Sequence, residues 1–439
     1  MRRPPAKPDR SGKMPVPGKK PAPGKKPAPG HRTRPGQAGA RAESTTRGHR
    51  GFTRRLYGTI AALLVLATLL TAGNVQQSHA NAASALERPG APAPFEIYTL
   101  QRGTGLDAQG EKAPDVIWGE NVTTDDGSGP TEIARAARIQ EFAGLPDAVA
   151  AVTINDDKTS SLELIPLSGD PVTRLPLPGH GTVENLEAGP KGLLAFSFTS
   201  APPSQEHWKT LFVYDTKDPR TLPRTVTGFD GKAVSALKYS FVPGTASLAI
   251  QTDARALILA DAAEGDAPPR PLGAHAEMRG FIPGTTKLHV ADKSPTPLTQ
   301  PAVHSAINLA DGSVAPFPLR ATDMDATSYA GSMAIIDETG SYAQVISETR
   351  SGSTTSVVAV TDQQQTRILY RPEPEWAQIR DICLSPDRKT LAIETTAPQG
   401  VTDRYIVRPG FMEMRTEIIS LDSGHRTRTL PGFQPGWCS

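Results

Sequence analysis

The sequence is 439 residues long, with a formal net charge of +2 and two cysteines. This length suits two or three ordinary domains or one large repeat domain, so it does not determine the domain count. The cysteines have no CxxC spacing and belong to no Cys/His cluster, which excludes a zinc-finger type of site. The small net charge conceals two oppositely charged parts: residues 1–55 contain 16 Lys or Arg and two acidic residues, whereas residues 87–439 contain 31 basic and 43 acidic residues.

Residues 1–55 form the basic part, which is rich in Pro, Gly and Lys. A six-residue pattern recurs in it, as PVPGKK from Pro15 and PAPGKK from Pro21. Such a segment buries too little apolar surface to offset its conformational entropy, so we predict a disordered tail. Next to a membrane, a basic tail is expected to contact anionic lipid headgroups. We expect no specific nucleic-acid partner, only non-specific binding at low salt.

Residues 56–76 are expected to form one transmembrane helix. The apolar stretch from Leu56 to Val75 reads LYGTIAALLVLATLLTAGNV. About 20 helical residues cover about 30 Å, the thickness of a bilayer's hydrocarbon core. Arg54 and Arg55 precede the stretch, and the positive-inside rule therefore places the N-terminus in the cytoplasm of a single-pass membrane protein. Residues 77–92 would be a linker, and residues 93–439 an extracytoplasmic domain.

The alternative for this segment is a cleaved signal peptide and a secreted protein. Ala80-Asn81-Ala82 fits a small-residue cleavage site, with cleavage near Ala82. The long leader and the gap between the apolar stretch and Ala82 favour the anchor. Both alternatives export the rest of the chain.

Cys383 and Cys438 are the two cysteines. In an oxidising compartment they could form a disulfide that closes a loop of about 55 residues and contributes roughly 3 to 5 kcal/mol. The alternative is two unpaired thiols.

Short β-type segments separated by Gly, Pro and Asp dominate the sequence beyond Pro92, and one hairpin recurs six times. The six copies begin at Ser161, Leu211, Ala256, Ser305, Ser356 and Glu417. Their turns are 46 to 60 residues apart, a period typical of four-stranded propeller blades. We therefore predict an all-β domain with six recurring sheets.

Each recurring hairpin follows another hairpin, and several of these share a proline turn. Phe241-Val-Pro-Gly, Phe281-Ile-Pro-Gly and Leu384-Ser-Pro-Asp each precede a Leu placed five residues after the proline. Proline presets the first corner of a turn, and Gly or Asp tolerates the second. Ser385-Pro-Asp-Arg-Lys-Thr-Leu-Ala392, followed by Leu421-Asp-Ser-Gly424, resembles the repeat of TolB-like, WD-type β-propellers over about residues 140–432.

This resemblance implies a six-bladed β-propeller, preceded here by one transmembrane helix and a disordered basic tail. Only one unit keeps Ser-Pro-Asp, and no Trp-Asp dipeptide occurs. A single blade cannot bury both of its apolar faces, whereas a closed ring buries them between neighbours. Residues 94–122 could supply a closing strand or pack across the ring. Residues 131–142 are the one stretch whose secondary structure is ambiguous.

Motifs of catalysis are missing from the sequence. It contains no Gly-x-Ser-x-Gly nucleophile elbow, no His-Glu-x-x-His, no phosphate-binding loop and no calcium loop. We therefore expect no enzyme, no cofactor and no metal site.

The linkers between the second and third strands of the units vary in length. They are short at 155–159 and 252–255 but long at 200–208, 293–301, 348–355 and 397–409. All should leave one face of the ring, and insertions on one face of a repeat array often mark the binding face. The residues that we expect to bind a partner there are His207, Trp208, Arg350, Arg404 and Tyr405. Drift in exposed loops is the alternative.

The predicted function is a non-catalytic, membrane-anchored extracytoplasmic propeller that acts as a protein-interaction platform. Its partner would be an extracytoplasmic protein or an envelope component, and the TolB resemblance implies a role in cell-envelope maintenance or transport. One alternative is an enzyme that uses the propeller channel, a lyase or a glycan hydrolase. The other is a sensor that signals through its cytoplasmic tail.

Overall fold

The computed structural model describes residues 96–437 with short gaps, at 106–111, 123–128, 202–208, 264–266, 293–301, 323–327, 351–352, 398–399, 401 and 403–411. The predicted tail (1–55), membrane segment (56–76) and linker (77–92) lie outside the described residues. Among the described residues, no helix is both long and apolar enough to cross a membrane.

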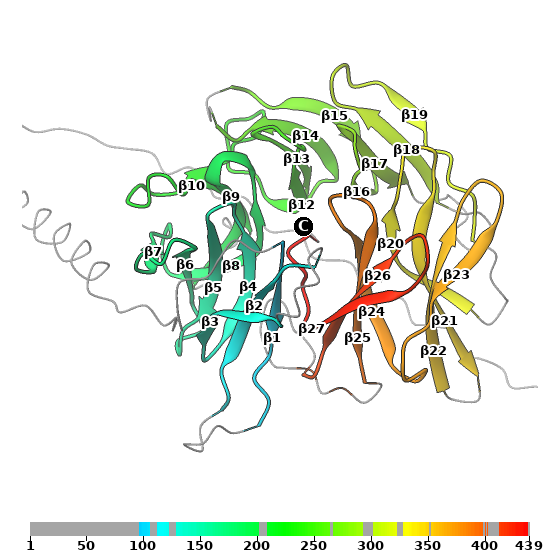
Figure 1. The fold of residues 1–439 in the computed structure, drawn as a ribbon. Helices are drawn as coiled ribbons and strands as arrows, with labels where there is room; N and C mark the ends of the chain where they lie inside the picture. The colour runs from blue at the N-terminus through cyan, green and yellow to red at the C-terminus, as the bar shows by residue number, and fades with distance from the viewer. Residues whose placement is uncertain are drawn as a thin grey trace, which may run out of the picture. The chain divides into compact units, whose positions relative to one another are not determined.

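The described chain forms a β-propeller of seven sheets, which we call blades 1 to 7 in chain order (Figure 1). Blades 2 to 7 each contain four consecutive antiparallel strands, whose order in the sheet follows the sequence. The first strand of each is innermost: β4 (Ile139–Gly144), β8 (Gly181–Ala188), β12 (Ala236–Phe241), β16 (Glu277–Phe281), β20 (Ser328–Ile335) and β24 (Gln378–Leu384). A 3₁₀ turn, η1 (Pro190–Gly192), joins β8 to the second strand of its blade.

The remaining strands of these six blades continue outward from the innermost ones. The second strands are β5 (Ala148–Ile154), β9 (Leu193–Ser200), β13 (Ser247–Thr252), β17 (Lys287–Asp292), β21 (Tyr342–Arg350) and β25 (Thr390–Thr396). The third strands are β6 (Ser160–Pro166), β10 (Thr210–Asp215), β14 (Ala256–Asp261), β18 (Val303–Asn308), β22 (Ser353–Thr361) and β26 (Arg415–Ser420). The short outer strands are β7 (Thr173–Leu175), β11 (Arg224–Thr225), β15 (Arg270–Ala274), β19 (Val314–Pro316), β23 (Thr366–Tyr370) and β27 (Arg426–Pro431).

Blade 1 is built from both ends of the described chain. Its sheet contains β1 (Ile97–Gln101), β2 (Asp115–Glu120) and β3 (Thr131–Ala136). The C-terminal segment runs along the free edge of β1: the amide of Leu100 donates to the carbonyl of Phe433 at 2.9 Å, and the Phe433 amide donates back at 3.0 Å. The segment therefore occupies the innermost position of blade 1 and closes the ring.

The prediction of six blades is wrong by one. The six recurring hairpins are the third and outer strands of blades 2 to 7, and each follows an inner hairpin as expected. The seventh blade escaped the repeat pattern because its four positions are shared between residues 97–136 and the C-terminal segment. The stretch 94–122 supplies two strands of a complete blade, and the ambiguous stretch 131–142 covers β3 and the first part of β4.

A buried ion pair lies at the closure. Arg102 and Asp115 are both buried, with Nη1 and Oδ2 3.4 Å apart. The guanidinium also donates to the carbonyl of Ile139 in blade 2 and stacks on the ring of Phe433, 5.1 Å from its centroid. Arg102 thus links β1, blade 2 and the C-terminal segment, the three parts of the chain that meet where the ring closes.

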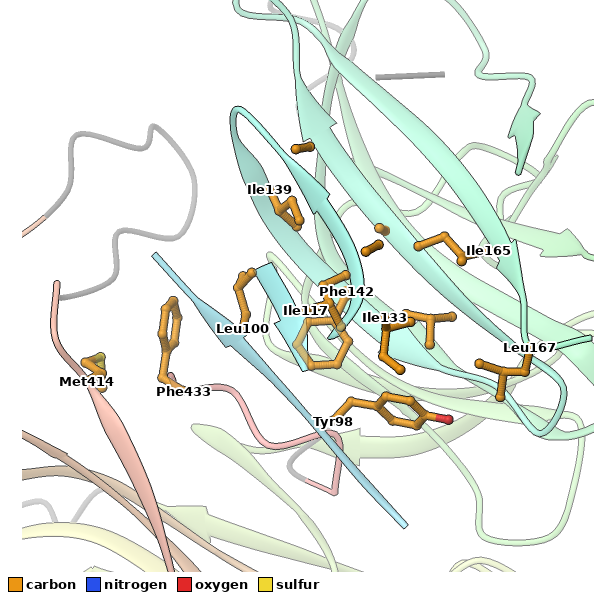
Figure 2. Packing of buried hydrophobic residues seen from close by; sticks show 14 residues of the cluster. Tyr98, Leu100, Ile117, Ile133, Ile139, Phe142, Ile165, Leu167, Met414 and Phe433 are labelled. Carbon is orange, nitrogen blue, oxygen red and sulfur yellow. The ribbon is translucent and has the colours of Figure 1, made fainter. Parts of the chain in front are cut away.

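Hydrophobic clusters fill most interfaces between neighbouring blades. The one between blades 1 and 2 joins Leu100 and Ile117 to Phe142 and includes Phe433 from the C-terminal segment (Figure 2). Similar clusters join blades 2 and 3, 3 and 4, 4 and 5, 6 and 7, and 7 and 1. Among the described residues, no such cluster joins blade 5 to blade 6. The core of this propeller is therefore distributed between blades, with one weaker interface.

Cys383 lies on β24. Cys383 and Trp437 both pack against the hydrophobic cluster between blades 7 and 1. The indole N–H of Trp437 donates to the carbonyl of Glu96 at 2.9 Å. Cys438 follows directly in the sequence but lies outside the described residues, so the Cys383–Cys438 disulfide stays a prediction.

Candidate functional site

One face of the ring is called the rim face. It carries the connections between blades and the linkers between second and third strands, as expected for up-and-down blades. Arg350 ends β21 and pairs with Ser353 at the tip of its hairpin. His207, Trp208, Arg404 and Tyr405 lie outside the described residues, so the structure neither brings these five residues together nor separates them.

Three exposed aromatic side chains lie at the rim face. Phe229 belongs to the connection from β11 to β12, Trp376 to the connection from β23 to β24, and Tyr329 is the second residue of β20. Their exposed fractions are 58%, 56% and 52%. None of the three lies in a linker within a blade, so none is among the residues predicted from the sequence. Phe229 and Trp376 stand in the connections between hairpins, and an aromatic residue in such a connection is the signal that could have found them.

The innermost strands share an irregularity that affects the centre of the ring. Each of the six pairs with its neighbour through one register shift, at Ile139/Glu141, Glu184/Glu187, Ala236/Lys238, Met278/Gly280, Ala330/Met333 and Ile379/Asp381. A β-bulge leaves a residue unpaired and redirects side chains. Leu237, Arg279 and Arg380 are such unpaired residues, and all three are exposed. The bulges therefore place apolar and charged side chains on the innermost edges of the sheets.

A cavity of about 570 Å³ lies among the innermost strands. Residues of β4, β8, β12 and β24 and of the C-terminal segment line it. Its charged lining residues are Glu187, Lys238 and Asp381. We call it the first cavity.

A second cavity of about 420 Å³ lies among the ends of β8, β12 and β16. It shares Glu187, Ala188 and Lys238 with the first cavity, and its additional charged residue is Arg279. Because three residues line both, the two cavities adjoin.

The carboxylate of Glu187 lies at their junction and is almost completely buried. Its Oε1 accepts hydrogen bonds from the Ser240 hydroxyl and from the Phe241 amide, both at 2.8 Å. Burial raises the pKa of Glu187 to about 7, although these two hydrogen bonds and the charge of Lys238 oppose the shift. Near neutral pH the side chain can therefore donate or accept a proton.

Lys238 shares the junction with Glu187. Its ammonium donates to the carbonyl of Arg279 at 3.3 Å. Although the side chain reaches the water of the cavities, surrounding protein lowers its pKa through desolvation, an effect that the nearby carboxylates of Glu277, Glu187 and Asp381 counteract. The junction thus holds one acid and one base in a partly desolvated setting, a feature enriched at functional sites.

Gln434 adds a polar group to the first cavity. Only 7% of the residue is exposed, and its Oε1 has no hydrogen-bond partner among the described residues. Its backbone is left-handed, with φ of 58°, and its amide donates to Oε1 of Glu394 at 2.7 Å. A buried acceptor without a partner costs free energy unless a ligand or water satisfies it.

Within the described residues, no group of three or more His, Cys, Asp or Glu is placed to hold a metal ion. The residues that line the two cavities come from β4, β8, β12, β16, β24 and the C-terminal segment, six parts of the chain far apart in the sequence that no common motif marks.

A scan against protein-family models finds no match, and no curated protein matches the sequence. Solved structures that resemble the fold include a protein provisionally assigned as TolB from Agrobacterium tumefaciens (10% identity, 70% of this chain and 86% of that chain covered, TM-score 0.35). Another is the β-propeller domain of the trilobed protease from Pyrococcus furiosus (11%, 76% and 96%, TM-score 0.48). A third is a protein provisionally assigned as 6-phosphogluconolactonase from Bacteroides fragilis (10%, 78% and 97%, TM-score 0.42). Identities this low transfer no function to this chain.

Proposed function

We propose that this protein is a non-catalytic binding propeller whose rim face holds an extracytoplasmic protein partner or envelope component. The observation that carries the proposal is the exposure of Phe229, Tyr329 and Trp376 on that face. Aromatic side chains are enriched in the core of protein interfaces and lose much apolar surface to water there. The long linkers of the same face, with His207, Trp208, Arg350, Arg404 and Tyr405, would extend this surface.

Site-specific photocrosslinking tests the rim face. p-Benzoylphenylalanine at position 376 should crosslink a defined partner in cells. The same group at position 222 is the matched control, because Leu222 is 68% exposed but lies between β10 and β11, on the opposite face. Phe229→Ser should reduce the crosslink from position 376 several-fold, and Leu222→Ser should not. An identical set of crosslinks from both positions would contradict the proposal.

Residues 56–76 would anchor the propeller to the cell membrane, with the N-terminus in the cytoplasm and the blades outside. The basic tail supports this proposal, since it would contact anionic lipid headgroups. N-terminal sequencing of the mature protein distinguishes the anchor from a secreted form cleaved near Ala82. A Cys383–Cys438 disulfide is consistent with an oxidising compartment on that side.

Deletion of residues 1–50 distinguishes the platform from the sensor. If the protein signals through its tail, the deletion abolishes function while insertion and partner crosslinking persist. For a platform, crosslinking and function persist together. An enzyme of the channel would instead lose function when Glu187 is replaced by Gln, with the rim-face crosslink unchanged.

A further inference from the structure

The two central cavities differ in the sign of the one charged residue that each does not share with the other. Glu187 and Lys238 line both cavities, so their charges do not distinguish one cavity from the other. The first cavity adds the carboxylate of Asp381, whereas the second adds the guanidinium of Arg279. An elongated molecule that fills both would therefore meet a negative group at one end and a positive group at the other.

We propose that the adjoining cavities form one binding site for a zwitterion of the size of an amino acid or a short peptide. Its ammonium would lie at Asp381 in the first cavity, and its carboxylate at Arg279 in the second. This site goes beyond the partner-binding rim face and is independent of it. The individual volumes, about 570 and 420 Å³, are within the range of small-molecule pockets.

The first cavity has the acceptors that an ammonium group requires. Asp381 is exposed to the cavity, and its Oδ1 accepts only the amide of Ile382 among the described contacts. An ammonium has three N–H donors and no acceptor, so the exposed carboxylate of Asp381 suits it. The negative charge of Asp381 would repel the carboxylate end of the ligand from this position.

The second cavity has the donors that a carboxylate requires. Arg279 pairs with Glu277 through one contact, Nη2 to Oε2 at 2.8 Å. A guanidinium has five N–H donors in a planar fork, so this ion pair leaves donors for a second carboxylate. The bulge at Arg279 leaves the residue outside the strand register and places its side chain in the cavity lining.

The middle of the site suits the uncharged part of such a ligand. Apolar side chains of Leu237, Phe241, Phe281 and Ile382 line the two cavities on either side of the junction. The carboxyl group of Glu187 and the ammonium of Lys238 can both hydrogen-bond a peptide group of the ligand. A simple anion or a simple cation would satisfy only one end of the site.

Saturation-transfer difference NMR on the full-length protein in nanodiscs tests the proposal. The probes are a defined pool of free amino acids and dipeptides, and the same dipeptides N-acetylated or C-amidated. We expect saturable binding of at least one free compound. Blocking either end should weaken it about 10-fold to 100-fold, since a hydrogen bond to a charged group contributes about 1.5 to 3 kcal/mol.

Two variants test which cavity binds which end of the ligand. Asp381→Asn should weaken binding of the free dipeptide about 10-fold or more and leave binding of the N-acetylated form unchanged. Arg279→Gln should weaken binding of the free dipeptide by a similar factor and leave binding of the C-amidated form unchanged. Asp422→Asn and Lys232→Gln, both exposed and outside the two cavities, are the matched controls and should bind like the wild type. Absence of saturable binding by every free compound, equal binding of blocked forms, or unchanged binding by both cavity variants would overturn the proposal. None of these results depends on the rim-face crosslink.

Discussion

The hydroxyl of Ser240 donates a hydrogen bond of 2.8 Å to Oε1 of Glu187, which joins the innermost strand of blade 4 to that of blade 3. The Phe241 amide donates to the same oxygen at 2.8 Å. One carboxylate oxygen of blade 3 thus accepts two hydrogen bonds from the innermost strand of blade 4. Its burial is costly when it is charged, and this cost is the origin of its raised pKa.

Glu187→Gln should remove a pH dependence of stability. The pKa of Glu187 is about 7 in the folded protein against 4.5 for an ordinary glutamate. Folding therefore favours the protonated form, and its contribution to stability is complete below pH 4.5 and is lost as the pH rises through 7. The wild type should lose about 2 to 4 kcal/mol relative to Glu187→Gln between pH 4.5 and pH 8. Urea unfolding at the two pH values measures this difference.

Glu338→Gln is the control for this experiment, because Glu338 is exposed and only its ion pair with Lys287 is lost. Its stability should run parallel to that of the wild type at both pH values. If Glu187→Gln also runs parallel to the wild type, the carboxylate is not protonated on folding.

His289 should produce the opposite pH dependence. Its Nε2 lies 2.9 Å from Nδ1 of His304. Burial, with the nearby His304, lowers the pKa of His289 from 6.5 to about 3, and burial also lowers that of His304. Unfolding then takes up protons below pH 6.5, so stability is present above that pH and is lost as the pH falls toward 3. Relative to His289→Gln, the wild type should lose about 2 to 4 kcal/mol between pH 7.5 and pH 4.

His425→Gln is the matched control, since His425 lies exposed in a hairpin turn. Circular dichroism during urea unfolding reports on all three proteins. An equal acid loss in wild type and His289→Gln would mean that the histidine pair stays accessible to protons in the folded state.

The hairpins that repeat in the sequence were predictable because each blade must bury two apolar faces. Each blade therefore has a similar pattern of apolar strands and polar turns. Turn residues such as Pro243 and Gly244 mark the inner hairpins that precede the recurring ones, and Gly244 has the positive φ of 73° that such turns require. Blade 1 was not predictable, because its pairing between Leu100 and Phe433 joins residues more than 300 positions apart without a repeated motif. Its assembly depends on closure of the ring, a property of all seven blades together.

The cavity residues were unpredictable for a related reason. Side chains alternate along a regular strand, and each bulge reverses that alternation from the bulge onward. Neither Lys238 nor Arg279 stands in a sequence motif, and only the register shifts beside them bring them to the cavities. Trp376 is different, because an aromatic residue in a Pro- and Glu-rich connection is visible in the sequence.

Gly432→Ala should weaken the closure of the ring. Gly432 has φ of +87°, and a Cβ atom there would lie 2.3 Å from the carbonyl oxygen of Leu100. Gly231 has a similar φ of +71°, and a Cβ atom there would meet no other atom within 4 Å, so Gly231→Ala isolates the backbone effect. The control should lose about 1 to 2 kcal/mol, and Gly432→Ala should lose about 2 kcal/mol more because the closing strand must shift. Equal losses in thermal unfolding would contradict this role of the C-terminal segment.

Cys438→Ser should destabilise the protein if the predicted disulfide forms. A loop of about 55 residues closed by a disulfide contributes roughly 3 to 5 kcal/mol. Reduction of the wild type should produce the same loss and leave Cys438→Ser unchanged. Peptide mapping without reductant should recover residues around Cys383 joined to the C-terminal peptide. Alkylation of both thiols in the unreduced, unfolded protein would contradict the bond.

The interface between blades 5 and 6 should be the least stable part of the ring. Among the described residues no hydrophobic cluster joins these blades, and Val303, Val314 and Tyr329 beside it are exposed. The ion pair between Lys287 and Glu338, at 3.3 Å, crosses the interface but is exposed on both sides and adds little stability.

Hydrogen exchange measured by mass spectrometry checks this expectation. Local opening is governed by the apolar surface that must be exposed, so peptides containing β19 and β20 should exchange about 10-fold to 100-fold faster than those containing β9 and β13. The latter two strands contribute Ala195 and Leu248 to the cluster between blades 3 and 4, and they serve as the internal control. Equal protection in both interfaces would mean that the ring opens only as a whole, with closure at blade 1 rather than local packing determining the barrier.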